Sequence, residues 1–251
     1  MMDRSIMIFL HGGGVSSWMW QEQVEIFKDT YECFAPDLMG HGTRAKEQIF
    51  SMNESAQEVI SWIKENANGR QVILIGFSLG AQIAVDVLSR EPDIVDIAVI
   101  NSALVMPLPW LHFMVRPLLP LTYPLLKKDW FIHLQAEKMG LSQHVLPHYA
   151  AESKKLQKKT LLTMFQENLH YRLPDTFQQA KARILVTVGE KEKGIMTRSA
   201  KKITNSHPKA TGVIVPGIGH TFTFEKKELF TEMIKSFIEA RALPVELTEI
   251  Q

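Results

Sequence analysis

Short apolar runs alternate with helix-like stretches along most of the chain, and this alternation constrains the fold more than any other feature. The runs are rich in β-branched residues and span residues 5–10, 31–36, 71–76, 96–101, 183–188 and 211–216. Most of them lack an apolar/polar alternation, which is typical of strands covered on both faces. Between them, apolar residues near a 3.6-residue period predict helices at 18–28, 53–67, 79–90, 195–206 and 224–241. The pattern predicts an α/β fold with a mostly parallel central sheet of about six strands, flanked by helices.

Residues 104–180 interrupt this alternation. They contain no convincing strand and are rich in Pro, Trp, His and Lys. Because a structureless loop of this length is improbable in a compact domain, we predict an inserted helical cap, with residues 1–103 and 181–251 forming the core domain. Its aromatic residues either line an apolar pocket or pack the cap on the core: Trp110, His112, Phe113, Trp130 and Phe131. The basic run KKLQKK at 154–159 is better explained as a solvated helix face than as an anion-binding patch.

Composition narrows the class of partner. The chain of 251 residues is 45% hydrophobic and 22% charged, as in ordinary globular proteins. A net charge of +1 gives no broad field that would attract nucleic acid or anionic lipid, so we expect a small-molecule partner. The lone Cys33 cannot form an internal disulfide and the first residues do not resemble a signal peptide, so a cytoplasmic location is favoured. Five prolines between 104 and 126 argue against a membrane span there.

The strongest local motif is Gly76-Phe77-Ser78-Leu79-Gly80, which directly follows the apolar run VILI and precedes the helix-like AQIAVDVLSR. A serine on such a tight strand-to-helix turn has a strained backbone and an outward-pointing hydroxyl. The start of the following helix offers free N–H groups, so the N–H of Leu79 can stabilise an oxyanion near Ser78. We therefore interpret Ser78 as a nucleophile rather than an ordinary turn serine.

A second motif, His11-Gly12-Gly13-Gly14, ends the first apolar run. Such a loop can approach a ligand closely and direct a second N–H at the oxyanion, most readily that of Gly13, with Gly14 as the neighbouring alternative. The spacing matches neither nucleotide-binding glycine motif, which argues against a phosphate site.

In this order, HGGG, PDLMGHG (36–42), GFSLG, VGEKEKG (188–194) and GIGH (217–220) resemble the α/β-hydrolase superfamily over nearly the whole chain except the cap. The resemblance implies a nucleophile, acid and histidine in that order: Ser78, Glu192 and His220. Family members more often carry aspartate at the acid position, and here Glu190 is the fallback for Glu192. A glutamate is competent, because the carboxylate need only hold the histidine tautomer and stabilise the imidazolium.

The resemblance implies hydrolysis of a carboxylic ester or thioester through an acyl-enzyme, with no metal or organic cofactor. Two alternatives stay open: a C–C bond hydrolase or lyase acting on a carboxylated metabolite, and a noncatalytic binding protein for a small ligand. An acidic substrate requires a cation in the pocket, for which Arg44, Arg116 and Arg172 are candidates. His144 and His148 have metal-pair spacing, but Pro147 interrupts their helix and no third ligand accompanies them. The sequence sets no oligomeric state.

Overall fold

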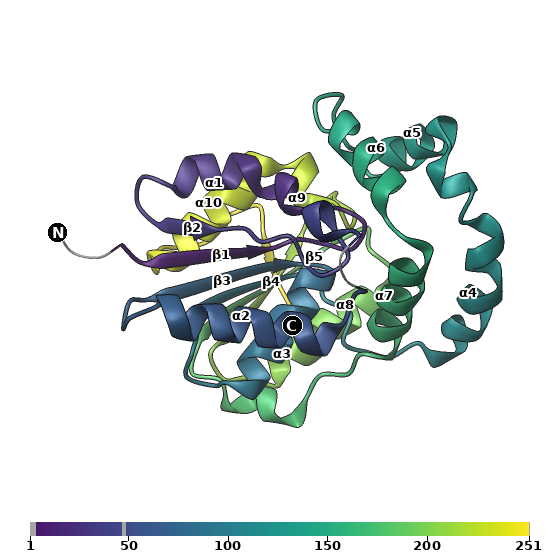
Figure 1. Cartoon of the computed structure of the whole chain (residues 1–251). Helices are drawn as coiled ribbons and strands as arrows, with labels where there is room; N and C mark the ends of the chain where they lie inside the picture. The colour runs from purple at the N-terminus through teal and green to yellow at the C-terminus, as the bar shows by residue number, and fades with distance from the viewer. Residues whose placement is uncertain (1–3, 47–48, 251) are drawn as a thin grey trace.

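The computed structural model of the chain describes residues 4–46 and 49–250 (Figure 1). A seven-stranded sheet lies at its centre in the order β2-β1-β3-β4-β5-β6-β7. The strands are β1 (Ile6–Leu10), β2 (Glu32–Phe34), β3 (Val72–Phe77), β4 (Ile97–Asn101), β5 (Arg183–Gly189), β6 (Ala210–Val215) and β7 (Thr248–Glu249). The first six run parallel, and β1, β3 and β4 are buried along their whole length.

The prediction of about six strands misses β7. This two-residue strand pairs antiparallel with β6 at the sheet edge, where Ile250 donates its backbone N–H to the Gly212 carbonyl. Its residues are exposed, so no apolar run marks it in the sequence. The six strands predicted from apolar runs are all present.

Helices cover both faces of the sheet (Figure 1). One layer contains α2 (Met52–Asn66), α3 (Leu79–Arg90) and α8 (Gly194–Asn205), and the other contains α1 (Gln21–Phe27) and α10 (Lys227–Ile238). Short helices complete the core: η1 (Ser17–Trp20), η2 (Gly42–Arg44), η4 (Asp175–Gln179) and α9 (Phe222–Glu225). The helix predicted at 224–241 is therefore divided, because Lys226 leaves the helical region with φ −132° and ψ 61°.

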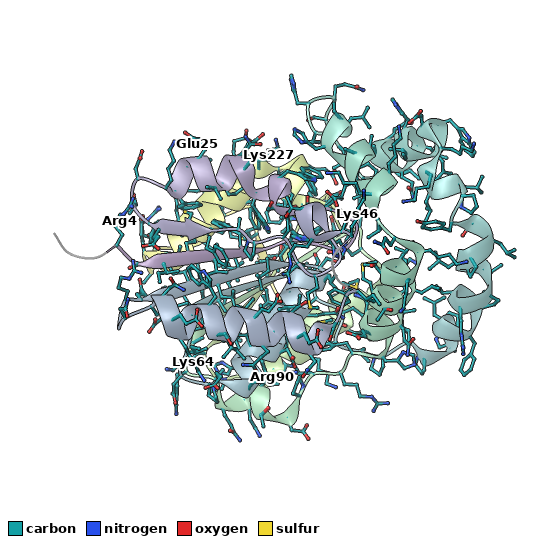
Figure 2. The ribbon with its side chains drawn as sticks, viewed as in Figure 1. Arg4, Glu25, Lys46, Lys64, Arg90 and Lys227 are labelled. Carbon is teal, nitrogen blue, oxygen red and sulfur yellow. The ribbon has the colours of Figure 1, made fainter. Side chains whose placement is uncertain are left out.

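The side chains fill the space between the sheet and its helices, whereas the charged residues labelled in Figure 2 lie on the outer surface. Lys64 on α2, for example, pairs with Glu91 at 2.6 Å, with both side chains substantially exposed. Within the described residues, no helix combines the length and apolarity needed to cross a membrane.

Residues between β4 and β5 form helices that stand beyond the carboxyl ends of the parallel strands (Figure 1). These are α4 (Pro109–Thr122), η3 (Leu125–Lys127), α5 (Asp129–Lys138), α6 (Leu146–Lys155) and α7 (Lys158–His170). Leu119, Leu161 and Met164 join the apolar cluster beneath α3, while Ile132 and Tyr149 join the cluster on the opposite face. The inserted segment thus packs on both layers of the core, at the end of the sheet where α/β proteins bind ligands.

Candidate active site

Ser78 occupies the tight turn between β3 and α3. Its backbone has φ 53° and ψ −108°, a left-handed conformation that costs energy for any residue with a Cβ. Its N–H donates to the Asn101 carbonyl at 2.9 Å, which ties the turn to the end of β4. The strained turn is fixed by its neighbours and presents the serine hydroxyl at the carboxyl edge of the sheet.

The glycines on either side of Ser78 are required by close packing. A Cβ on Gly76 would lie 2.5 Å from the Gly80 carbonyl oxygen, and a Cβ on Gly80 would lie 2.2 Å from the Leu10 carbonyl oxygen. Both distances are far below van der Waals contact with backbone atoms that cannot move aside. The small residues therefore allow α3 to begin directly against β1 and the glycine-rich loop.

His220 connects Ser78 to Glu192. Its Nε2 lies 2.9 Å from Ser78 Oγ, and its Nδ1 lies 2.7 Å from Glu192 Oε2. An ionised carboxylate can only accept, so Nδ1 carries the proton and Nε2 accepts from the serine hydroxyl. The structure thus brings the three predicted residues into one hydrogen-bonded line, from loops that follow β3, β5 and β6.

The Glu192 carboxylate is almost completely buried, with a side chain 2% exposed. Burial alone would raise its pKa, but hydrogen bonds from His220, Ser102 Oγ and the Gly189 N–H outweigh this effect and lower the pKa. Ser102 and Gly189 donate to Oε1 at 2.6 and 2.9 Å. Glu192 is therefore held as an anion, with its other oxygen directed at the imidazole.

Glu190, the alternative acid, faces a different group. Its Oε2 accepts the Gly217 N–H at 2.7 Å, which fastens the turn after β6. Its own N–H donates to the Val215 carbonyl at 3.0 Å. In this structure Glu190 supports the loop that leads to His220, whereas Glu192 contacts the imidazole itself.

The glycine-rich loop lies directly against the Ser78 turn. A Cβ on Gly12 would be 3.6 Å from Ser78 Cβ, and one on Gly13 would be 3.6 Å from the Leu79 side chain. Leu79 is the first residue of α3, so its N–H has no acceptor within the helix. The predicted oxyanion donors Gly13 and Leu79 therefore belong to adjoining segments beside the serine.

His11 holds this loop in place. It is fully buried, accepts the Leu38 N–H at Nε2 (2.9 Å) and contacts the Gly12 carbonyl with Nδ1 (2.8 Å). Burial, reinforced by the neighbouring His41, lowers its pKa to about 3. A neutral His11 with its proton on Nδ1 fits both contacts, so this residue links the glycine-rich loop to the 36–42 loop.

Asp37 and Glu152 organise the surrounding loops, and the sequence gives little sign of either role. Asp37 accepts from the N–H groups of Ser17 and Thr43 at 2.9 and 2.8 Å. Glu152, on α6, is 3% exposed and accepts from Ser16 Oγ and the Gly42 N–H at 2.8 and 2.7 Å. A lone glutamate in a basic helical segment has no pattern that predicts a buried contact to the core.

A mostly apolar cavity of about 210 Å³ adjoins the glycine-rich loop. Gly13 and Gly14 form its wall on the core side, and the helices inserted between β4 and β5 form the rest. Its lining consists of Gly13, Gly14, Leu119, Tyr123, Leu126, Gln135, Tyr149, Ser153, Leu156, Leu161, Met164 and Phe165. None of these described residues carries a formal charge at neutral pH.

The aromatic residues considered for a pocket wall do not line this cavity. Trp110, Phe113 and Trp130 are 61%, 77% and 61% exposed, while Phe131 is half-buried and packs edge-to-face on Trp130. The His112 side chain lies outside the described residues. Of the two alternatives for these residues, the pocket wall is therefore wrong for the described ones, because the cavity is faced by Leu119 on α4 and by Tyr123, which follows the helix.

None of the three candidate arginines lines the cavity. Arg44 pairs with Glu58 through two contacts of 2.8 Å, and Arg116 and Arg172 are exposed. His148 stacks on Trp18, with ring centroids 5.8 Å apart. Within residues 4–46 and 49–250, no group of three His, Cys, Asp or Glu side chains is placed to hold a metal.

The chain is similar in sequence and in structure to known hydrolases. The sequence profile described as the alpha/beta hydrolase family matches residues 7–232. Protein ABHD8 of Bos taurus is 34% identical over 94 residues, which are 36% of this chain but only 22% of that protein. The 2-hydroxy-6-oxo-6-(2'-aminophenyl)hexa-2,4-dienoic acid hydrolase of Metapseudomonas resinovorans is 24% identical and covers 94% of this chain and 84% of its own. An esterase structure from Exiguobacterium antarcticum superposes with a TM-score of 0.78 at 16% identity, covering 94% of this chain and 92% of its own.

Proposed function

The chain belongs to the alpha/beta hydrolase family, and on that premise we propose that it is a serine hydrolase that cleaves a carboxylic ester or thioester. Ser78 acts as the nucleophile, His220 as general base and acid, and Glu192 as the carboxylate that orients His220. Residues 104–180 act as a cap that encloses the acyl group of the substrate. The substrate is a small molecule, and no metal takes part.

One observation carries the preference for an ester: the cavity beside the glycine-rich loop is apolar and is lined by no Arg or Lys among the described residues. An anionic metabolite would leave its charge without a partner there, at a cost of several kcal/mol or more. An uncharged acyl chain is stabilised instead, by about 0.8 kcal/mol for each buried methylene.

The reaction follows from the line of hydrogen bonds. His220 Nε2 removes the Ser78 proton as Oγ attacks the carbonyl carbon, and the N–H groups of Gly13 and Leu79 stabilise the resulting oxyanion. The imidazolium, held by Glu192, then protonates the leaving alcohol or thiol, which departs to give the acyl-serine. Water deprotonated by His220 attacks this intermediate, and collapse of the second tetrahedral species releases the acid and restores Ser78.

A second candidate is hydrolysis of a carbon–carbon bond. It is supported by the similarity, over 94% of this chain, to a relative named as a hydrolase of a hexadienoic acid. The same serine and histidine can serve that chemistry, but a carboxylated substrate requires a cation near the cavity. The uncharged lining therefore makes this candidate second to the ester.

The deciding experiment compares wild type with Ser78→Ala on p-nitrophenyl esters of graded chain length, alongside labelling by a fluorophosphonate and mass mapping. We expect both turnover and labelling to vanish in Ser78→Ala, and to persist in Ser61→Ala, which changes a remote serine on α2. Labelling of Ser78 without ester turnover would instead direct the search to C–C substrates. A wild-type protein that neither turns over esters nor reacts with the probe would contradict the proposal and favour a noncatalytic binding protein.

A further inference from the structure

The outer face of α4 is apolar and exposed to solvent. Side chains spaced three or four residues apart form one stripe along the helix: Trp110, Phe113, Met114, Leu118 and Leu121, each between 52% and 77% exposed. On the opposite face, Val115 and Leu119 pack against the protein, as does Tyr123 directly after the helix. The helix is therefore apolar on both sides, and the core covers only one of them.

Beyond α4, Leu125, Trp130 and Leu134 are also exposed. Together, residues 110–134 hold eight of the eleven exposed large apolar side chains in the described part of the chain. Exposed apolar residues scattered singly are ordinary, but a concentration of this kind marks a binding surface. We call the eight residues the α4–α5 stripe. Figure 1 shows α4 as the element farthest from the sheet, with open space beyond it.

Positive charge lies next to the stripe. Residues 104–134 contain Arg116, Lys127 and Lys128 and a single acid, Asp129, which pairs with Lys154 at 2.6 Å. The basic run 154–159 lies against the residues that link α4 to α5, because Tyr123 Oη donates to the Leu156 carbonyl at 3.0 Å and Lys127 Nζ donates to the Lys154 carbonyl at 2.7 Å. Lys155, Lys158 and Lys159 are exposed there. The net charge of +1 for the whole chain conceals this local concentration.

We propose that the α4–α5 stripe and the adjacent lysines bind the surface of a bilayer that carries anionic headgroups. Trp, Phe and Leu on one helix face with Lys and Arg beside them is the composition of helices that lie in a membrane interface. The apolar side chains enter the headgroup region, and the lysines pair with lipid phosphates and carboxylates.

The helix lies on the bilayer and does not cross it. Its 14 residues extend over about 21 Å, less than the hydrocarbon thickness of about 30 Å. A second copy of the chain fits the surface less well. A twofold contact through this face would bring the same cations of both copies together, since such interfaces pair one patch with itself.

The test uses the full chain carrying Ser78→Ala, so that binding is measured without turnover and independently of the proposed function. Cosedimentation compares vesicles of phosphatidylcholine with vesicles of equal parts phosphatidylcholine and phosphatidylserine. We expect binding to the anionic vesicles, weakened by added salt. Phe113→Ser with Leu121→Ser should lower the partition coefficient by about tenfold or more. Lys155→Gln and Lys158→Gln should each lower it by about fivefold, on anionic vesicles only.

Matched controls are Ile26→Ser, an exposed apolar residue on α1, and Lys201→Gln, an exposed lysine on α8; both should bind like the parent. Circular dichroism melts establish that each variant is folded. Absence of binding to anionic vesicles, or binding that the stripe variant leaves unchanged, would overturn the proposal. So would a concentration-dependent dimer in sedimentation velocity that the stripe variant abolishes, which would assign the surface to a contact between copies.

Discussion

At the scale of the residue, Glu192 and Glu190 provide a matched pair. Glu192→Gln removes the anion that stabilises the His220 imidazolium, so we expect kcat/KM for a p-nitrophenyl ester to fall by about 10³–10⁴-fold. Glu190→Gln keeps an amide oxygen that can accept the Gly217 N–H, so its kcat/KM should stay close to wild type. The reverse order of effects would assign the acid to Glu190. Both variants are compared with wild type by steady-state kinetics. Their melting temperatures are measured first, to establish that each variant is folded at the assay temperature.

Asp37 gives a pH-dependent prediction. Burial would raise its pKa, but hydrogen bonds from Thr43 and Ser17 lower it to about 2, below the 3.8 of a free side chain. A carboxyl group with a lowered folded-state pKa stabilises the fold above its unfolded pKa, and this contribution disappears as the pH falls towards the folded value. Asp37→Asn should therefore lower the unfolding free energy near neutral pH by about 1–3 kcal/mol, with the difference shrinking between about pH 4 and about pH 2.

Urea unfolding at a series of pH values measures this difference. Asp93→Asn, at an exposed position between α3 and β4, is the control and should change stability little at any pH. A constant difference between Asp37→Asn and wild type down to pH 2 would mean that its hydrogen bonds do not depend on ionisation.

The sequence predicts residues of the site where a motif fixes the backbone, and fails where a contact joins distant segments. Ser78 and His220 follow from motifs at strand ends, and Glu192 follows from its place after β5. Ser102, which donates to Glu192, belongs to no motif. Only the pairing of β4 with β5 brings the two loops together, and that pairing is a property of the folded sheet.

At the scale of the element, the start of α3 depends on Gly80. An added Cβ would lie 2.2 Å from the Leu10 carbonyl oxygen, so β1 and α3 would have to separate. We expect Gly80→Ala to lower the unfolding free energy by about 3 kcal/mol or more. Gly219→Ala, where a Cβ meets nothing within 4 Å, should change it by less than about 1 kcal/mol. Equal losses in urea unfolding would refute the close-packing argument.

Secondary structure could be predicted well in the core because uniform burial gives strands a plain signature. The runs at 71–76 and 183–188 correspond to β3 and β5 to within one residue at each end. The edge strand β7 and the break at Lys226 depend on tertiary contacts and leave no local pattern. In the inserted segment, α4 contains Pro117 and Pro120, so its helical character could be expected only from the length of the segment.

At the scale of the whole molecule, Glu152 joins the inserted helices to the core. Its buried carboxylate accepts hydrogen bonds from Ser16, just after the glycine-rich loop, and from Gly42, the last residue of the 36–42 loop. Glu152→Ala removes the acceptor of these two hydrogen bonds. The rate of backbone amide hydrogen exchange should therefore rise by about 10-fold or more, both in α6 and around residues 16 and 42. Glu137→Ala, at an exposed position on α5, should leave exchange unchanged. A rise confined to α6 would show that the two parts open independently.

Ser102 lies where the inserted segment begins, and its contacts limit where a chimaera could be joined. It has φ 56°, donates its N–H to the Thr187 carbonyl at 2.8 Å and its hydroxyl to Glu192 at 2.6 Å. Three residues later, the Val105 N–H bonds Ser199 Oγ at 3.2 Å. A foreign insertion grafted at Ser102 would remove the hydrogen bond that supports Glu192, whereas a crossover after Val105 preserves it. An exchange of the inserted helices must therefore leave residues 102–105 with the recipient core, and the new helices must also supply an acceptor for Ser16 and Gly42 in place of Glu152.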